Sequence, residues 1–103
     1  MKPTKPYYAV IFTSKRTTGD NDYGKMADQM LCLAQKQKGF IGVESAREEV
    51  GITVSYWETL EDIQNWKDNT EHLAAQKKGK KDWYASYHVR ICKVEREYKF
   101  VLK

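Results

Sequence analysis

Runs with the two-residue period of a β-strand alternate along this chain with runs that have the period of an α-helix. The clearest strand-like run and the clearest helix-like run follow one another within residues 51–76. Ile52 to Trp57 is rich in β-branched and aromatic residues, which predicts a strand. Thr59 is a good N-cap, and apolar residues then recur at helical spacing up to Trp66. A strand therefore leads directly into a helix that must pack back on the sheet.

The same periodicities predict the other elements. Gly39 follows a long amphipathic run and is expected to end the first helix. The full set is strands over residues 7–13, 40–47, 52–57 and 87–98, and helices over residues 23–37 and 59–68.

We expect the second helix to break at Asp68, Asn69 and Thr70, because all three are capping residues that compete with helical hydrogen bonds. A second helical piece would then cover residues 71–78, and a short helical turn over residues 81–86 would position Trp83 and Tyr84. The expected break matters because it would rotate His72 toward the face that carries Trp66.

The element order β-α-β-β-α-β predicts an α+β fold with ferredoxin-like topology in a single domain over residues 1–103. Its four-stranded antiparallel sheet would carry both helices on one face. However, the strands carry apolar residues on both alternations, as Val10 and Ile11 illustrate. The second face is therefore expected to pack on another copy of the chain in a homodimer.

Composition narrows the function classes. The net charge of +4 is concentrated in the lysines of residues 77–81, which we interpret as a solvated helix end and loop rather than a nucleic-acid site. The chain has no apolar run long enough for a membrane span or a signal peptide, so we expect a cytoplasmic protein without membrane contact. Cys32 and Cys92 are expected to be buried free thiols, and no metal site is predicted.

Several blocks then resemble one family, the antibiotic biosynthesis monooxygenases. They are GFIGVES at residues 39–45, ITVSYW at residues 52–57, the pair Trp66 and His72, and WYASYHVRICKVEREY at residues 83–98. The resemblance covers about residues 7–98 and implies a dimeric α+β barrel. It also implies either cofactor-free oxygenation of phenols, anthrones or hydroquinones by dioxygen, or haem degradation.

The haem-degrading branch implies an asparagine on the first strand, a tryptophan on the second helix and a histidine ligand ten residues later. Trp66 matches the tryptophan, but Gln76 occupies the ligand position and residues 7–14 contain no asparagine. We therefore expect a monooxygenase without a cofactor that acts on a small aromatic substrate. A non-catalytic dimer that binds small ligands remains the first alternative, and a haem-binding or haem-degrading monooxygenase remains the second.

The candidate catalytic residues are His72 and Glu44. An imidazole titrates near neutral pH and suits a general base, although His72 could equally cap a helix piece. Glu44 lies in the middle of a strand, where a carboxylate needs a partner such as Arg90 or Arg47.

The candidate substrate-binding residues are Trp66, Tyr56, Trp83, Tyr84, His88 and Arg90. Trp66 could instead be a core residue, and His88 and Arg90 share a strand face that meets either the substrate or the partner subunit.

Overall fold

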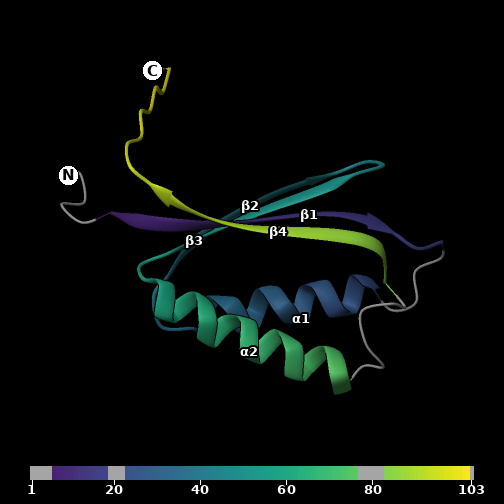
Figure 1. The fold of residues 1–103 in the computed structure, drawn as a ribbon. Coiled ribbons are helices and arrows are strands. Elements are labelled where there is room, and N and C mark those ends of the chain that lie inside the picture. The colour runs from purple at the N-terminus through teal and green to yellow at the C-terminus, as the bar shows by residue number, and fades with distance from the viewer. Residues whose placement is uncertain (1–5, 19–22, 77–82, 103) are drawn as a thin grey trace.

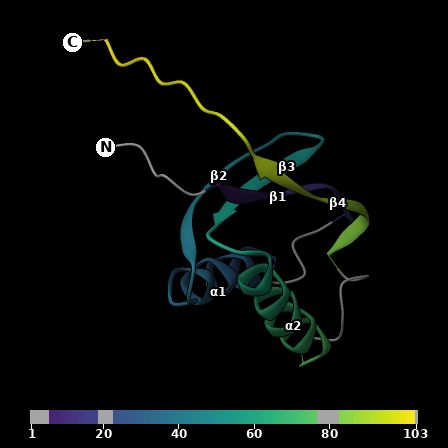
Figure 2. The same ribbon diagram turned by 60° about the vertical axis from the view of Figure 1, so that its left-hand side comes forward.

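Four antiparallel strands form one sheet in the order β2-β3-β1-β4, and both helices lie against the same face of it (Figures 1 and 2). The computed structural model describes residues 6–18, 23–76 and 83–102, and only the backbone of residues 71–76. The elements are β1 (Tyr7–Arg16), α1 (Tyr23–Gln35), β2 (Phe40–Arg47), β3 (Gly51–Trp57), α2 (Leu60–Gln76) and β4 (Tyr84–Val94). The predicted ferredoxin-like α+β fold is confirmed.

The strand register separates the two faces of the sheet. Trp57 stacks on Trp66 of α2, so the face that carries Trp57 is the one that the helices cover. Tyr8 of β1 is the register partner of Trp57, so Tyr8 and every second residue after it also point to this covered face. Tyr7, Ala9 and the residues that alternate with them point to the other side, which we call the open face.

A β-bulge decides the direction of Tyr84. Lys15 pairs with Ser86 and Arg16 pairs with Tyr84, so Ala85 has no register partner on β1. Without the bulge, Tyr84 and Tyr87 would point to opposite faces, because they are three residues apart. With it, both rings lie on the covered face, with centroids 5.8 Å apart. The predicted helical turn over residues 81–86 is wrong where it can be compared, because Tyr84 to Ser86 begin β4; residues 81 and 82 lie outside the described residues.

Helix α2 is unbroken, so the predicted break at Asp68, Asn69 and Thr70 is wrong. The Thr70 hydroxyl donates a hydrogen bond to the Lys67 carbonyl (2.8 Å), and the Asn69 amide donates one to the Asn65 carbonyl (3.1 Å). These side chains bond to the preceding turn of their own helix and therefore do not interrupt it. The helix start agrees with prediction, because the Asp62 N–H donates to the Thr59 hydroxyl (3.0 Å).

The end of α1 differs from the prediction. The helix ends at Gln35, and Gly39 lies further on, as the third residue of a turn closed by the Phe40 N–H and the Gln37 carbonyl (3.3 Å). The φ of Gly39 is 83°, which a type II turn requires at this position. A Cβ on Gly39 would also overlap the carboxylate of Asp62 on α2. Glycine is therefore required here by a turn and by contact with the second helix.

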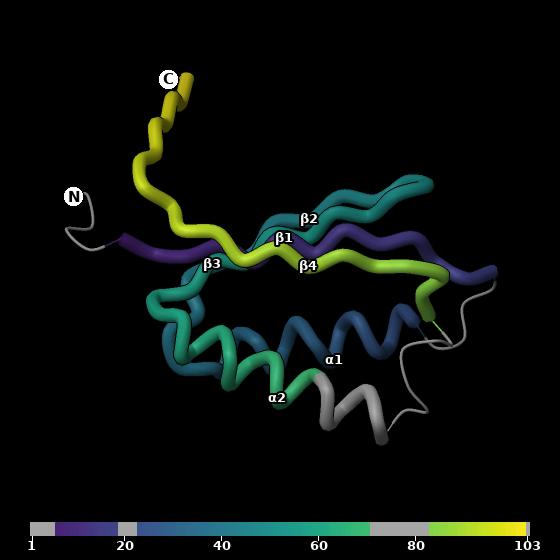
Figure 3. Tube along the Cα trace, in the orientation of Figure 1, coloured from purple at the N-terminus to yellow at the C-terminus, as the bar shows by residue number. Residues whose placement is uncertain are grey.

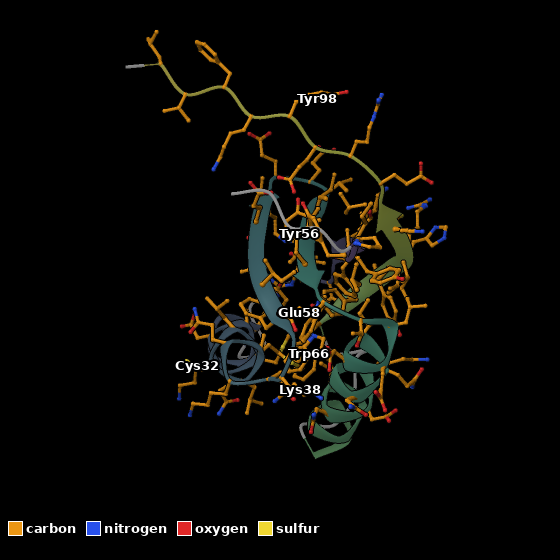
Figure 4. All side chains as sticks on the ribbon, turned by 90° about the vertical axis from the view of Figure 1, so that its left-hand side faces the viewer. Cys32, Lys38, Tyr56, Glu58, Trp66 and Tyr98 are labelled. Atoms are coloured by element: carbon orange, nitrogen blue, oxygen red, sulfur yellow. The ribbon has the colours of Figure 1, made fainter. Side chains whose placement is uncertain are left out.

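The core lies between the sheet and the helices. Its buried apolar residues on this side of the sheet are Met26, Ala34, Trp57, Ile63 and Trp83, whereas buried Ala9 points to the open face. Both cysteines are exposed, so the prediction of buried thiols is wrong. Cys92 pairs with Ala9 on the open face, which no helix covers, and Cys32 lies on the outside of α1 (Figure 4).

After Val94 the chain leaves the sheet on the side away from the helices (Figure 3). The Tyr7 hydroxyl donates a hydrogen bond to the Glu97 carboxylate (2.6 Å), which ties this segment to β1. The residues beyond are strongly exposed despite their apolar character, with Tyr98 and Phe100 at 83% and 84%.

The lysines of residues 77–81 lie outside the described residues. In the part of the chain that is described, no helix combines the length and apolar character that a bilayer crossing needs.

Candidate functional site on the covered face

An aromatic stack occupies the covered face at the junction of β3 and α2. The Trp57 side chain is fully buried, and its indole N–H donates to the Ser55 hydroxyl (2.9 Å). Trp66 stacks on it with ring centroids 5.8 Å apart, and Phe40 meets it edge-on at 5.4 Å. Trp66 is half-buried. It is therefore a packing residue that still presents part of its ring to the surroundings.

A second group lies at the other end of the covered face, and we call it the tyrosine–arginine cluster. It consists of Ser14 and Arg16 from the end of β1, Tyr23 from the start of α1, Arg47 from the end of β2, and Tyr84 from the start of β4. Five residues from four elements thus meet here, because the ends of three strands and the start of a helix lie together in this fold.

The two guanidinium groups of the cluster converge on one ring. The Arg16 guanidinium lies 3.6 Å from the Tyr23 ring centroid, and the Arg47 guanidinium lies 5.8 Å from the same centroid. Each is held by a further contact: Arg16 Nε–H donates to the Trp83 carbonyl (3.1 Å), and Arg47 donates to the Ser14 hydroxyl. Ser14 itself is buried. Cation–π contacts and hydrogen bonds therefore fix both charges in place.

Aromatic rings surround the phenol of Tyr84. The Phe12 ring centroid lies 5.3 Å from that of Tyr84 and 5.3 Å from that of Tyr87. Tyr23 meets Tyr84 edge-on at 5.8 Å. Buried Trp83 and Met26 pack beneath Tyr23 and Tyr84. The cluster is therefore a polar group set in a largely aromatic surface.

Tyr84 is a neutral hydrogen-bonding group at ordinary pH. Burial is the main cause that raises the pKa of its hydroxyl well above that of a free phenol, and the neighbouring Tyr23 hydroxyl adds to the rise. The positive charges of Arg47 and Arg16 oppose it. The site thus combines a phenol that stays protonated with two permanent positive charges.

The structure brings together only some of the predicted site residues. Trp66, Trp83 and Tyr84 lie on the helix side of the sheet. Tyr56, Glu44, His88 and Arg90 instead point to the open face, since Tyr56 pairs with Ala9, Glu44 with Val54, His88 with Thr13 and Arg90 with Ile11. Figure 4 shows Trp66 beside the helices and Tyr56 away from them. The expectation that Tyr56 and Trp66 face one site is wrong, because consecutive strand residues alternate between faces.

Glu44 has a different partner from the one predicted. The Tyr56 hydroxyl donates a hydrogen bond to the Glu44 carboxylate (2.9 Å), and Glu44 is exposed rather than buried against Arg90 or Arg47. The side chain of His72 lies outside the described part of the chain, and so does that of Gln76. Because α2 is unbroken, the break expected to bring His72 onto the face of Trp66 is absent.

Sequence reasoning did not identify Ser14, Arg16 and Tyr23 as site residues. Ser14 and Arg16 lie beyond the predicted strand end at Thr13, because β1 extends three residues further than predicted. A continued two-residue alternation of Phe12, Ser14 and Arg16 was the available signal. Within the described residues, no group of three or more His, Cys, Asp or Glu could hold a metal ion.

Comparisons with known proteins agree with this architecture. The chain is 52% identical over 97 residues to the uncharacterized protein YqjZ of Bacillus subtilis (strain 168), covering 92% of this chain and 85% of YqjZ. The fold is similar to SnoaB, a cofactor-independent oxygenase from Streptomyces nogalater, with a TM-score of 0.73 and 8% identity over 89% of this chain and 96% of SnoaB.

A second similar structure is a single-substitution mutant of MhuD, which was solved with two manganese protoporphyrin IX molecules bound per active site. Its TM-score is 0.67 at 17% identity, over 90% of this chain and 99% of MhuD. The model of one family, the antibiotic biosynthesis monooxygenases, matches residues 7–78. The chain therefore belongs to the antibiotic biosynthesis monooxygenase family.

Proposed function

We propose that this protein is a cofactor-independent monooxygenase that oxidises a small aromatic substrate, such as a phenol, anthrone or hydroquinone, with dioxygen. Its family and its fold similarity to SnoaB support the reaction class. The observation that carries the proposal is the tyrosine–arginine cluster, in which the protonated Tyr84 phenol and two guanidinium groups lie among aromatic rings. This environment suits an aromatic ring that becomes negatively charged.

The chemistry requires such an anion. The methylene group of an anthrone loses a proton, and the resulting carbanion transfers its electrons to dioxygen and forms a C–O bond to give a hydroperoxide. Loss of water leaves the ketone, so that one methylene group and one dioxygen give one carbonyl group and one water. In this proposal, the Tyr84 hydroxyl donates a hydrogen bond to the substrate oxyanion, and the positive charge of Arg16 stabilises it. The carbonyl oxygen of an anthrone carries most of that charge after deprotonation.

His72 is our candidate for the proton acceptor. The chain has two histidines, and His88 points to the open face. His72 is therefore the imidazole that could serve on the helix side of the sheet. It lies on α2, six residues after Trp66.

The proposal is tested by measuring oxygen consumption with anthrone and with hydroquinone in a buffer that contains a metal chelator. Tyr84→Phe should lower kcat about 10²-fold because it removes one donor to the oxyanion. Tyr56→Phe is the matched control, since its phenol lies on the open face, and it should leave kcat unchanged. His72→Ala should lower turnover roughly 10²- to 10⁴-fold if His72 is the base. Binding of these compounds without oxygen uptake would favour the alternative, a ligand-binding protein without catalysis.

We also propose that the active form is a homodimer in which the open faces of two copies pack together. The open face carries apolar side chains that remain exposed, such as Ile52 at 46%. The C-terminal segment leaves the sheet on this same side with exposed Tyr98 and Phe100 (Figure 1). Exposed apolar surface of this kind is typical of an interface.

A further inference from the structure

We infer that the substrate or ligand of this protein is an aromatic acid, whose carboxylate binds at Arg47 in the tyrosine–arginine cluster. The inference deepens the proposed function and rests on it only for the reaction; the binding site itself is argued from the geometry of Arg47, Ser14, Gly51 and Tyr84. The feature to be explained is a guanidinium that is held firmly although its side chain is exposed.

Arg47 is anchored at one end of its guanidinium. Its Nη2 donates to the hydroxyl of Ser14, which is only 2% exposed. The guanidinium also lies over Gly51, where a Cβ would overlap it. Gly51 has no positive φ that would demand glycine, so its missing side chain serves here to make room for Arg47. The local backbone and a buried hydroxyl thus hold the guanidinium against the covered face.

The held charge has no carboxylate beside it in the described part of the chain. There, Arg47 contacts the Ser14 hydroxyl and the Tyr23 ring, and its guanidinium fills the position that a side chain on Gly51 would occupy. A guanidinium presents five N–H donors in a plane, and a carboxylate matches that plane with two parallel hydrogen bonds. Arg47 is also exposed, so a ligand can reach it from solvent.

The neighbours of Arg47 select an aromatic acid rather than a simple anion. The Arg47 guanidinium lies 5.8 Å from the Tyr23 ring centroid, and the Tyr23 ring meets that of Tyr84 edge-on, so a group bound at Arg47 adjoins this pair of phenols. Beyond Tyr84, the rings of Phe12 and Tyr87 provide surface for stacking. A carboxylate attached to an aromatic ring would use both parts of this surface, whereas an inorganic anion would use only the polar part.

Isothermal titration under nitrogen tests the inference with 2,5-dihydroxybenzoate, hydroquinone and inorganic phosphate. The first two differ by one carboxylate. We expect the acid to bind about 10- to 100-fold more tightly than hydroquinone, the usual range for a hydrogen-bonded charge pair. Phosphate at the same concentration should not displace the acid. Equal affinity for the acid and hydroquinone, or phosphate binding as tight as that of the acid, would overturn the inference.

Three variants locate the effect. Arg47→Met keeps the apolar stem and should abolish the preference for the acid. Gly51→Ala keeps the charge but displaces the guanidinium, so it should reduce the preference in the same direction. Arg90→Met, on the open face, is the matched control and should leave the preference intact. A preference that survives both Arg47→Met and Gly51→Ala would place the carboxylate elsewhere and refute the site.

The binding experiment separates this inference from the proposed reaction. Because oxygen is excluded, carboxylate-dependent binding that requires Arg47 supports the site even if no compound is oxidised. Oxygen uptake with anthrone and no preference for the acid would support the reaction and reject the site.

Discussion

The indole of Trp66 on α2 stacks on the indole of Trp57 at the end of β3, with ring centroids 5.8 Å apart and an angle of 28° between the planes. This contact joins the second helix to the sheet at the point where the chain turns from one into the other. It also shows that Trp66 is at least partly a core residue, which the sequence left open.

The two tryptophans should contribute unequally to stability. Trp57 is fully buried, so Trp57→Ala should lower the free energy of unfolding by about 3–5 kcal/mol. Trp66→Ala should cost less, because its ring is only half-buried. Urea denaturation of both variants measures the difference. Equal losses would show that the exposed part of Trp66 is covered by something in solution, such as a second copy of the chain.

Gly39 and Gly42 form a matched pair for a second test. Gly39→Ala introduces a side chain at a φ of 83° and against the Asp62 carboxylate, so it should destabilise the protein by more than the ~1–2 kcal/mol of a left-handed residue. Gly42→Ala meets nothing within 4 Å and should change stability by less than about 1 kcal/mol. Thermal unfolding of the two variants gives the comparison, and a tolerated Gly39→Ala would contradict the turn described here.

Two phenols on the open face should ionise late. The hydrogen bond to Glu97 is the main cause that raises the pKa of Tyr7 from 10.0 to about 12, and the hydrogen bond to Glu44 raises the pKa of Tyr56. Because the folded-state pKa of each group exceeds that of the unfolded chain, both favour the folded state fully below pH 10 and lose this effect at higher pH. For Tyr7 the loss extends to about pH 12.

Ultraviolet titration of tyrosinate measures this behaviour. Tyr7→Phe should remove one late-ionising phenol, and Glu97→Gln should move the Tyr7 midpoint back toward 10.0. An unchanged titration curve in Glu97→Gln would show that the C-terminal segment does not stay at Tyr7 in solution.

The open face should mediate dimer formation. Light scattering should give twice the chain mass at micromolar concentration. Ile52→Lys places a charge in the expected interface and should shift the protein toward monomer. Leu60→Lys is the control, since Leu60 is 54% exposed and lies on α2, on the helix side of the sheet. A monomeric wild-type protein would refute the dimer.

We expect that the purified protein does not bind haem tightly. The position that the haem-degrading branch gives to its histidine ligand is Gln76, and β1 contains no asparagine. Titration with haem should therefore leave the Soret band close to that of free haem. A stoichiometric Soret shift that disappears in His72→Ala would instead make His72 an iron ligand.

The order of elements and the strand–helix junction were predictable from sequence alone. The period of Ile52 to Trp57 fits only a strand, and the spacing of Leu60, Ile63 and Trp66 fits only a helix. Thr59 marks the boundary between the two elements. Both strands of the β2–β3 hairpin were also predicted, β2 with its observed bounds. Such local signals survive in the fold because burial of one face reinforces them.

The candidate site was decided by tertiary structure. Ser14 and Arg16 are far in sequence from Arg47 and from Tyr84, and only the strand order places the ends of these three strands together. The bulge at Ala85 turns Tyr84 onto the covered face, where sequence alternation would have placed it opposite to Tyr87. Whether α2 continues through Asn69 and Thr70 likewise depended on the partners of their side chains, which form hydrogen bonds to the preceding turn of the same helix. Each of these outcomes rests on which partner a group meets after folding, and the periodicity of one segment carries no information about that partner.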